Sequence, residues 1–162
     1  MKKIAGVIYI TLMIMAIFTG CASAAEKAQY WKRFNPGSWV LYELPDGLQK
    51  KVSLVNKTDA QITLKVEMIK QGDIVGSSEE EILLDLDTES ETPVKPDMLE
   101  YVQDTLVANQ VMVCKVYEYD TGKGMQKLWF SEQIPGGLVQ SALEGSLTLT
   151  LIDYEAKYYV TK

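Results

Sequence analysis

The sequence contains no histidine among its 162 residues. Histidine is the usual acid–base group near neutral pH, and it also activates serine and cysteine nucleophiles and ligates metals. Its absence excludes catalytic triads built on imidazole, and it excludes imidazole metal sites. Carboxylate catalysis remains possible in principle, but no motif in the sequence supports an enzyme, so we expect a protein that is not an enzyme and that uses no cofactor and no metal.

Cysteine is almost as scarce, with two residues in the chain, Cys21 and Cys114. Cys21 lies at the end of an apolar leader, so no pair remains for a disulfide within the folded chain. Cys114 stands in a strand-like run, where it shares a face with Met112 and Val116. This position predicts a buried and unreactive thiol.

The chain lacks an apolar run long enough for a comfortable membrane span. Its longest run, Ile4 to Phe18, is shorter than the roughly 20 residues that a spanning helix needs. The basic start Met1-Lys2-Lys3 precedes this run, and small residues follow it, which is the order of a secretory signal. We expect a signal peptide over residues 1–24 and a single β-rich domain over residues 25–162.

Two processing sites compete at the end of the leader. Ala22-Ser23-Ala24 fits the small-x-small pattern of ordinary signal peptidase, which would cut after Ala24. Phe18-Thr19-Gly20-Cys21 resembles a bacterial lipobox, although Phe18 stands where an aliphatic residue is usual. That resemblance implies a lipidated Cys21, and Ala22 after it implies sorting to the outer membrane. The expected location is thus the periplasm, either free or anchored to the outer membrane as a lipoprotein.

An excess of basic residues is also missing. The whole chain has a net charge of −6, and loss of Lys2 and Lys3 with the leader makes it −8. Such a field repels a phosphate backbone, and no basic patch interleaved with aromatics is present. We therefore expect no nucleic-acid partner.

What the sequence does contain is apolar alternation with period two, which predicts strands with one dry face. In Ala60–Lys70 the alternating residues are Ile62, Leu64, Val66 and Met68, and in Ser146–Ile152 they are Leu147, Leu149 and Leu151. Turn signals such as Pro45-Asp46-Gly47 separate the runs. The predicted strands are 39–44, 48–55, 61–70, 74–86, 111–119, 125–130, 138–143, 146–152 and 154–160.

The segment 98–108 is ambiguous. Leu99, Val102 and Leu106 would share one face of a helix, whereas Val102, Leu106 and Ala108 would share one face of a strand. We favour a hairpin with its tip at Asn109-Gln110, and the helix remains the alternative. The polar stretch Thr88 to Asp97 before it is predicted to be a surface loop.

These patterns predict an all-β fold with few helical residues. The expected architecture is a curved antiparallel meander sheet that forms a half-open barrel of about 8–10 strands. The acidic residues Asp85, Asp87 and Glu89 would line one strand face, but Pro96 stands where a calcium loop needs its bidentate glutamate. That face is expected to be solvated rather than to hold a metal.

One motif, Trp129 to Gln140, sets two aromatics before a Pro-Gly-Gly turn. Pro135 fixes φ at the first corner and Gly136 supplies the positive φ of a type II turn. Adjacent strand residues point to opposite faces, so Trp129 and Phe130 cannot both enter one core; one of them either is covered or meets a ligand. The predicted ligand-binding residues are Trp39, Tyr42, Trp129, Phe130, Leu138 and Val139.

The run Phe130-Ser131-x-x-Ile134-Pro135-Gly136-Gly137-Leu138-Val139, with Gly37-Ser38-Trp39-Val40-x-Tyr42, resembles small exported bacterial proteins and lipoproteins of unassigned function. More distantly, the strand order resembles the outer-membrane lipoprotein carrier (LolA-like) group. That group has a curved antiparallel sheet around an apolar cavity that holds acyl chains. The resemblance implies an acyl chain or another lipid as ligand, although the helices that plug those carriers have no strong counterpart in the sequence.

Three functions are compatible with the sequence. The favoured one is a non-catalytic envelope protein that binds a lipid or acyl chain in its curved sheet. The alternative is an interaction module that uses a sheet edge or acidic face to bind an envelope protein. A hydrolase is the third, and it would require carboxylates gathered in a cleft.

Overall fold

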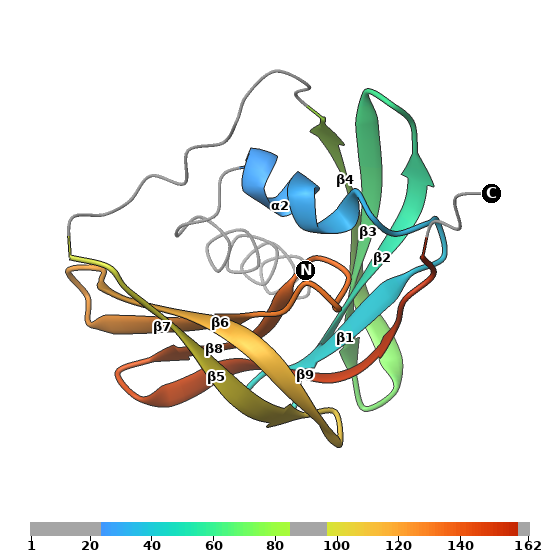
Figure 1. The fold of residues 1–162 in the computed structure, drawn as a ribbon. Helices are drawn as coiled ribbons and strands as arrows, with labels where there is room; N and C mark the ends of the chain where they lie inside the picture. Colours follow the sequence, from blue (N-terminus) through green and yellow to red (C-terminus); the bar gives the residue numbers. More distant parts are fainter. Residues whose placement is uncertain (1–23, 85–96, 159–162) are drawn as a thin grey trace.

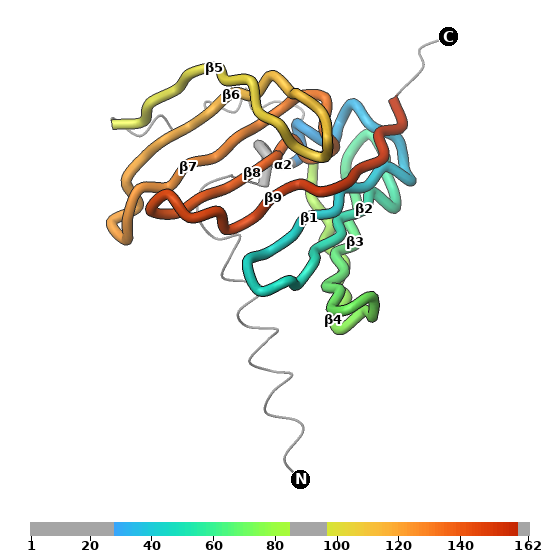
Figure 2. The backbone as a smooth tube through the Cα atoms, turned by 90° about the horizontal axis from the view of Figure 1, so that it is seen from below, coloured from blue at the N-terminus to red at the C-terminus, as the bar shows by residue number. Residues whose placement is uncertain are grey.

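A computed structural model describes residues 24–84 and 97–158 of the chain. Nine antiparallel strands form one sheet in the order β4-β3-β2-β1-β9-β8-β7-β6-β5, and the sheet does not close into a barrel (Figures 1 and 2). The strands are β1 (Trp39–Glu43), β2 (Gln49–Lys57), β3 (Gln61–Lys70), β4 (Asp73–Leu83), β5 (Leu99–Val107), β6 (Gln110–Asp120), β7 (Met125–Phe130), β8 (Leu138–Leu143) and β9 (Ser146–Glu155). The predicted curved antiparallel meander is confirmed.

The ambiguous segment 98–108 is a strand, as favoured. It forms β5, which pairs with β6 along its whole length without a register shift. The turn between them has positive φ at Ala108 (50°) and Asn109 (59°), so its tip lies one residue earlier than predicted. Two successive positive φ values define a type I′ turn, whose twist matches that of the flanking strands.

Two predictions about the C-terminal strands are wrong in detail. The expected break at Asp153 does not occur, and β9 runs continuously from Ser146 to Glu155 with a bulge where it pairs with Leu41 and Tyr42 of β1. Leu147 is half exposed, while Leu149 and Leu151 are buried as predicted. A register shift between β8 and β9, at Ser141/Ala142, breaks the alternation of burial near Leu147.

Several predictions fall outside the described residues. They are the signal peptide, the lipobox with Cys21, the loop from Thr88 to Asp97 apart from its last residue, and the acidic face of Asp85, Asp87 and Glu89. The structure therefore leaves them as predictions.

One helix that the alternation did not predict, α2 (Ala24–Trp31), packs against the sheet. It lies in the angle between β2–β4 on one side and β6–β8 on the other (Figure 1). Ala28 and Trp31 are buried beneath it, and Phe34 just after it is fully buried. The ammonium of Lys57 binds the carbonyl oxygens of Lys32 and Phe34, which anchors the carboxyl end of the helix to the end of β2.

Buried side chains lie on both faces of the sheet, whereas the sequence predicted a single apolar face. Directly paired residues share a face, and one row of pairs runs through Glu43, Thr150, Gln140, Trp129 and Val116. Glu43 is exposed, but Trp129 and Val116 in the same row are buried. The outer strands thus bury the face that β1 exposes. The β5–β6 hairpin also returns to the middle of the sheet, where the side-chain oxygens of Tyr154 of β9 and Gln110 of β6 are 3.3 Å apart.

Candidate functional site

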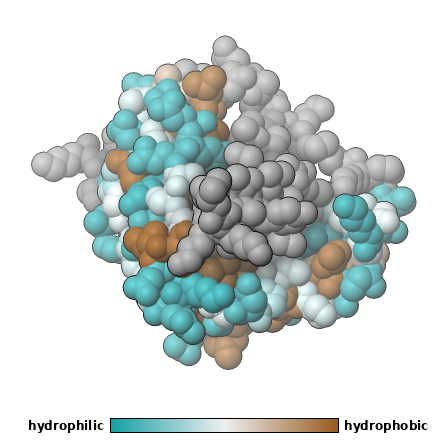
Figure 3. Space-filling model, turned by 180° about the vertical axis from the view of Figure 1, so that it is seen from behind, coloured by the Kyte–Doolittle hydropathy of each residue, from teal (hydrophilic) through white to brown (hydrophobic). Residues whose placement is uncertain are grey.

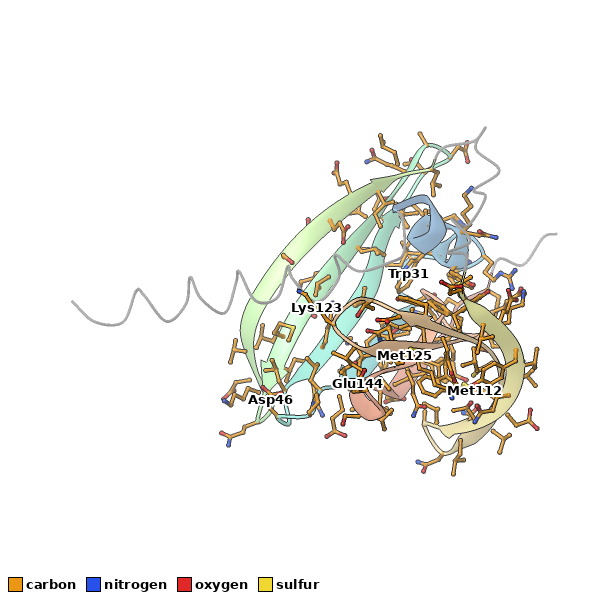
Figure 4. All side chains as sticks on the ribbon, turned by 90° about the vertical axis from the view of Figure 1, so that its left-hand side faces the viewer. Trp31, Asp46, Met112, Lys123, Met125 and Glu144 are labelled. Atoms are coloured by element: carbon orange, nitrogen blue, oxygen red, sulfur yellow. The ribbon has the colours of Figure 1, made fainter. Side chains whose placement is uncertain are left out.

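The Pro-Gly-Gly turn packs directly under helix α2. Gly136 and Gly137 have φ values of 76° and 75°, which confirms the positive φ predicted for Gly136. A Cβ on Gly136 would lie 2.9 Å from Nε1 of Trp31, and one on Gly137 would lie 2.4 Å from Cδ1 of Tyr30. The two glycines therefore serve the close approach of these rings as well as the turn, and Figure 4 shows Trp31 between the helix and the sheet.

Four of the six predicted ligand-binding residues come together beside this helix. Tyr42 is buried, which raises the pKa of its hydroxyl, and its Oη donates a hydrogen bond of 2.9 Å to the carbonyl oxygen of Leu138. Leu138 pairs directly with Phe130, and the next residue, Val139, is fully buried in the core. The four residues come from β1, β7 and β8, and the hydrogen bond from Tyr42 to Leu138 spans the intervening strand β9.

Aromatic rings form the half-buried border of that neighbourhood. The rings of Tyr30 and Phe130 stack with centroids 5.5 Å apart, and Tyr117 meets Phe130 edge-on at 5.8 Å. All three side chains are half-buried, so each ring keeps part of its surface exposed. Half-exposed aromatics offer a large contact area at low entropic cost.

The other two predicted residues are tryptophans that share the face of Glu43 by alternation and strand pairing, although Trp129 is buried in the same hydrophobic core as Tyr42 and Val139. Trp39 donates a hydrogen bond of 3.0 Å from Nε1 to Glu155, and the ammonium of Lys51 sits 4.6 Å from its ring centroid. Trp129 belongs to the row of pairs that starts at Glu43. Of the predicted set of six, four residues thus lie together beside α2, and the two tryptophans make other contacts.

Trp129 belongs instead to a polar and aromatic group that we call the Lys127 cluster, formed by Tyr101, Glu118, Lys127 and Trp129. The Lys127 ammonium lies 2.8 Å from a Glu118 oxygen, 4.9 Å from the Trp129 centroid and 5.3 Å from the Tyr101 centroid. The Tyr101 hydroxyl also donates to Glu118. The cluster thereby holds β5, β6 and β7 together.

The hydrogen bonds of the cluster shift the pKa values of two of its side chains. Those from Lys127 and Tyr101 lower the pKa of Glu118, and the bond to Glu118 raises the pKa of Lys127. The buried Nε1 of Trp129 has no hydrogen-bond partner in the described part of the chain. Because Lys127 already fills the space between the two rings, the cluster is best understood as a structural clamp.

Four exposed apolar side chains on one face of the β5–β6 hairpin form a second candidate surface. We call it the edge patch, and its members are Val102 (66 % exposed), Leu106 (71 %), Val111 (71 %) and Val113 (62 %). Leu106 pairs directly with Val111, while Val102 and Val113 stand opposite Lys115 and Asp104 on the same face. Exposed apolar side chains gathered on one surface mark interaction sites.

The two end strands of the sheet differ in how they are protected against pairing with a strand of another protein. At one end, β4 carries Glu79-Glu80-Glu81, has a register shift against β3 and is contacted by α2. Its exposed apolar residues Ile74 and Leu83 stand near its two termini. At the other end, β5 is regular and has no proline, lysine or bulge, and its charges are two separated carboxylates, Glu100 and Asp104, rather than a continuous acidic run.

No metal or membrane-spanning element is found over residues 24–84 and 97–158. In these ranges no three His, Cys, Asp or Glu side chains converge to hold a metal ion. No helix there is long and apolar enough to cross a bilayer.

On the face seen in Figure 3, hydrophilic surface is interrupted by hydrophobic groups.

No family model, no curated protein and no solved structure matches this chain. The resemblance to exported proteins and to the lipoprotein carriers therefore remains a prediction. The function has to be argued from the geometry of the chain itself.

Sequence reasoning missed residues on both candidate surfaces. Tyr30 and Trp31 follow the leader directly, and a Tyr-Trp-x-x-Phe spacing before the first strand was a usable signal for an aromatic helix end. Val102 and Leu106 were placed on one strand face, but alternation does not tell which face is exposed. The residues of the Lys127 cluster come from three strands, so no pattern within a short stretch of sequence could have predicted it.

Proposed function

We propose that this chain is a non-catalytic binding module that receives an extended segment of a partner protein along β5. The contrast between the two ends of the sheet carries the proposal. The β4 end is acidic, shifted in register and beside α2, whereas β5 is regular over all nine residues and lies beside the edge patch. A protein that protects only one edge leaves the other available for pairing.

Strand addition uses two kinds of contact that β5 offers. As an end strand, β5 has no strand partner on its outer side among the described residues, so its outward N–H and C=O groups can form a new ladder. The edge patch adds apolar surface next to that ladder. Main-chain bonds supply affinity and the alternate side chains supply specificity.

The proposal places this module outside the cytoplasm. The leader and the lipobox resemblance support export, with either a free periplasmic protein or one anchored through Cys21. The partner is then another envelope protein, which agrees with the net charge of −8 after loss of the leader lysines, a charge that repels nucleic acid.

The test is a selection of nine-residue peptides that bind the purified domain, followed by hydrogen exchange on the complexes. Bound peptides are expected to protect amides of β5 and to leave those of β4 unchanged. The double variant Val102→Thr with Leu106→Thr should lose at least tenfold in affinity, because it removes two apolar side chains from the contact.

The matched control places the same kind of change on the other edge. Ile74→Thr with Leu83→Thr alters two β4 residues of similar exposure, 60 % and 73 %, and should leave binding unchanged. Equal losses in both double variants, or protection at β4, would contradict the proposal.

A second candidate function is the binding of an apolar ligand, such as a lipid or acyl chain, beside α2. The half-buried rings of Tyr30, Tyr117 and Phe130 next to Leu138 favour it. Mass spectrometry of an organic extract from the purified protein and titration with a fluorescent fatty acid test it. Phe130→Ala should weaken the binding, Val55→Ala at an exposed site should not, and no bound lipid in either assay would reject this function.

A further inference from the structure

We infer that the segment received by β5 carries basic residues alternating with apolar residues. This inference rests on the proposed function and specifies the chemistry of its partner. On the face that holds the edge patch, β5 presents Glu100, Val102, Asp104 and Leu106 in that order. An added strand places its own side chains directly opposite these four, so acidic, apolar, acidic and apolar positions each select their counterpart.

The two carboxylates are available for a partner. Glu100 and Asp104 are both exposed, and neither has an ion-pair partner among the described residues. Lys115 on β6, which pairs with Val102, lies diagonally between them and forms no ion pair with either. The strand itself contains no basic residue.

A second copy of this chain does not offer the basic and apolar side chains that this edge requires. Antiparallel pairing of β5 with itself about Gln103 sets Glu100 against Leu106 and Val102 against Asp104, which leaves each apolar side chain facing a carboxylate. Pairing about Val102 sets Glu100 against Asp104, and pairing about Asp104 sets that residue against itself. Like charges directly opposite destabilise a pair of strands, and two copies also repel through their net charge.

The position of the carboxylates also argues against a lipid surface as the occupant. The edge patch is bordered by Glu100 and Asp104, and the negative potential of an anionic bilayer repels acidic groups. A basic and apolar strand instead satisfies both the apolar and the acidic positions at once.

Designed peptides of nine residues, the length of β5, test the inference on the purified domain. In the first peptide, threonine alternates with valine, lysine, valine and lysine, in the order that faces Leu106, Asp104, Val102 and Glu100. The second has glutamine and the third has glutamate in place of lysine. We expect the lysine peptide to bind roughly tenfold more tightly than the glutamine peptide, and the glutamate peptide to bind most weakly.

Charge reversal on the protein supplies the decisive comparison. Glu100→Lys with Asp104→Lys should invert the order of the three peptides, while Glu79→Lys with Glu81→Lys on β4 should preserve it. Both changes are at exposed strand positions, so the fold is checked in each case by circular dichroism. The preference for lysine should also shrink as salt is added.

The outcomes separate this inference from the proposed function. Equal binding of all three peptides, still sensitive to Val102→Thr with Leu106→Thr, would overturn the charge preference and leave strand addition standing. Failure of every peptide to bind a folded domain would overturn both. Binding of vesicles of phosphatidylglycerol in place of peptides would show a lipid surface and would also overturn the inference.

Discussion

Glycine 136 illustrates how one residue joins the helix to the sheet. Its φ of 76° is matched by that of Gly145 (77°), but a Cβ on Gly136 would meet the Trp31 ring, whereas one on Gly145 would have nothing within 4 Å. Gly145→Ala should therefore cost only backbone strain, about 1 kcal/mol. Gly136→Ala should cost about 2–4 kcal/mol, since the ring must also move.

Urea denaturation of the two glycine variants measures this difference. The near-ultraviolet spectrum of the tryptophans should also change in Gly136→Ala and remain unchanged in Gly145→Ala. If the two variants lost equal stability, the close packing of α2 on the turn would be wrong.

The Glu118–Lys127 pair gives a second prediction at the scale of residues. The folded pKa of Glu118 is lowered, so its stabilising contribution is present above its unfolded pKa of about 4.3 and is lost as the pH falls through the folded value. The raised pKa of Lys127 keeps the pair charged to above about pH 10.4. Glu118→Gln should therefore cost up to about 1 kcal/mol near neutral pH and nothing in acid.

Denaturation at a series of pH values from acid to neutral tests the pair. Glu132→Gln is the control, because its partner Arg33 and Glu132 itself are at least half exposed and the loss should be smaller. A Glu118→Gln cost that persisted in acid would show that packing, rather than charge, holds the cluster.

At the scale of elements, Lys57 decides how firmly α2 is held. Its ammonium reaches the Lys32 and Phe34 carbonyl oxygens, and burial lowers its pKa, partly offset by Asp59. Lys57→Met keeps the apolar stem but removes the charged hydrogen bonds, so it should cost about 1.5–3 kcal/mol.

Hydrogen exchange should show faster exchange of the α2 amides in Lys57→Met. The matched variant Lys65→Met breaks an ion pair with Glu67 on the surface of β3 and should cost no more than about 1 kcal/mol. An unchanged helix in Lys57→Met would mean that ring packing alone holds α2.

The elements also show where sequence reasoning reaches its limit. Alternation located the strands because each half-buried strand repeats its pattern locally, as in Ile62, Leu64 and Met68, all buried. It failed at Leu147 and at the break expected at Asp153, because a register shift is a property of two strands. It gave no warning of α2, since that helix is fixed by its contacts with the Pro-Gly-Gly turn, more than 100 residues away in the chain.

For the same reason, the sequence did not show how the six predicted ligand-binding residues are distributed. Tyr42, Phe130, Leu138 and Val139 lie near one another, whereas Trp39 and Trp129 share the face of Glu43 by alternation and strand pairing. A single curved face would have brought all six together. The rolled sheet instead buries different faces in its two halves, and this depends on how β5 and β6 return to β9.

At the scale of the whole molecule, the predicted lipidation of Cys21 would set how far the domain lies from a membrane. The helix begins at Ala24, three residues after Cys21, and an extended chain of that length spans about 10 Å. A lipid on Cys21 would therefore hold the body of the protein close to the membrane surface. Cleavage after Ala24 would release it instead, so the choice of processing site would decide which partners the proposed binding edge β5 could meet.

Labelling with radioactive palmitate in a Gram-negative host distinguishes the two routes. If lipidation occurs, Cys21→Ala should abolish the label and move the protein from the membrane to the soluble fraction. Ala24→Phe, which blocks only the ordinary site, should leave label and location unchanged, because the lipobox cut precedes it. A wild-type protein that is unlabelled and begins at Ala25 would refute anchoring, and the proposed partner of β5 would then be expected among soluble as well as membrane-bound envelope proteins.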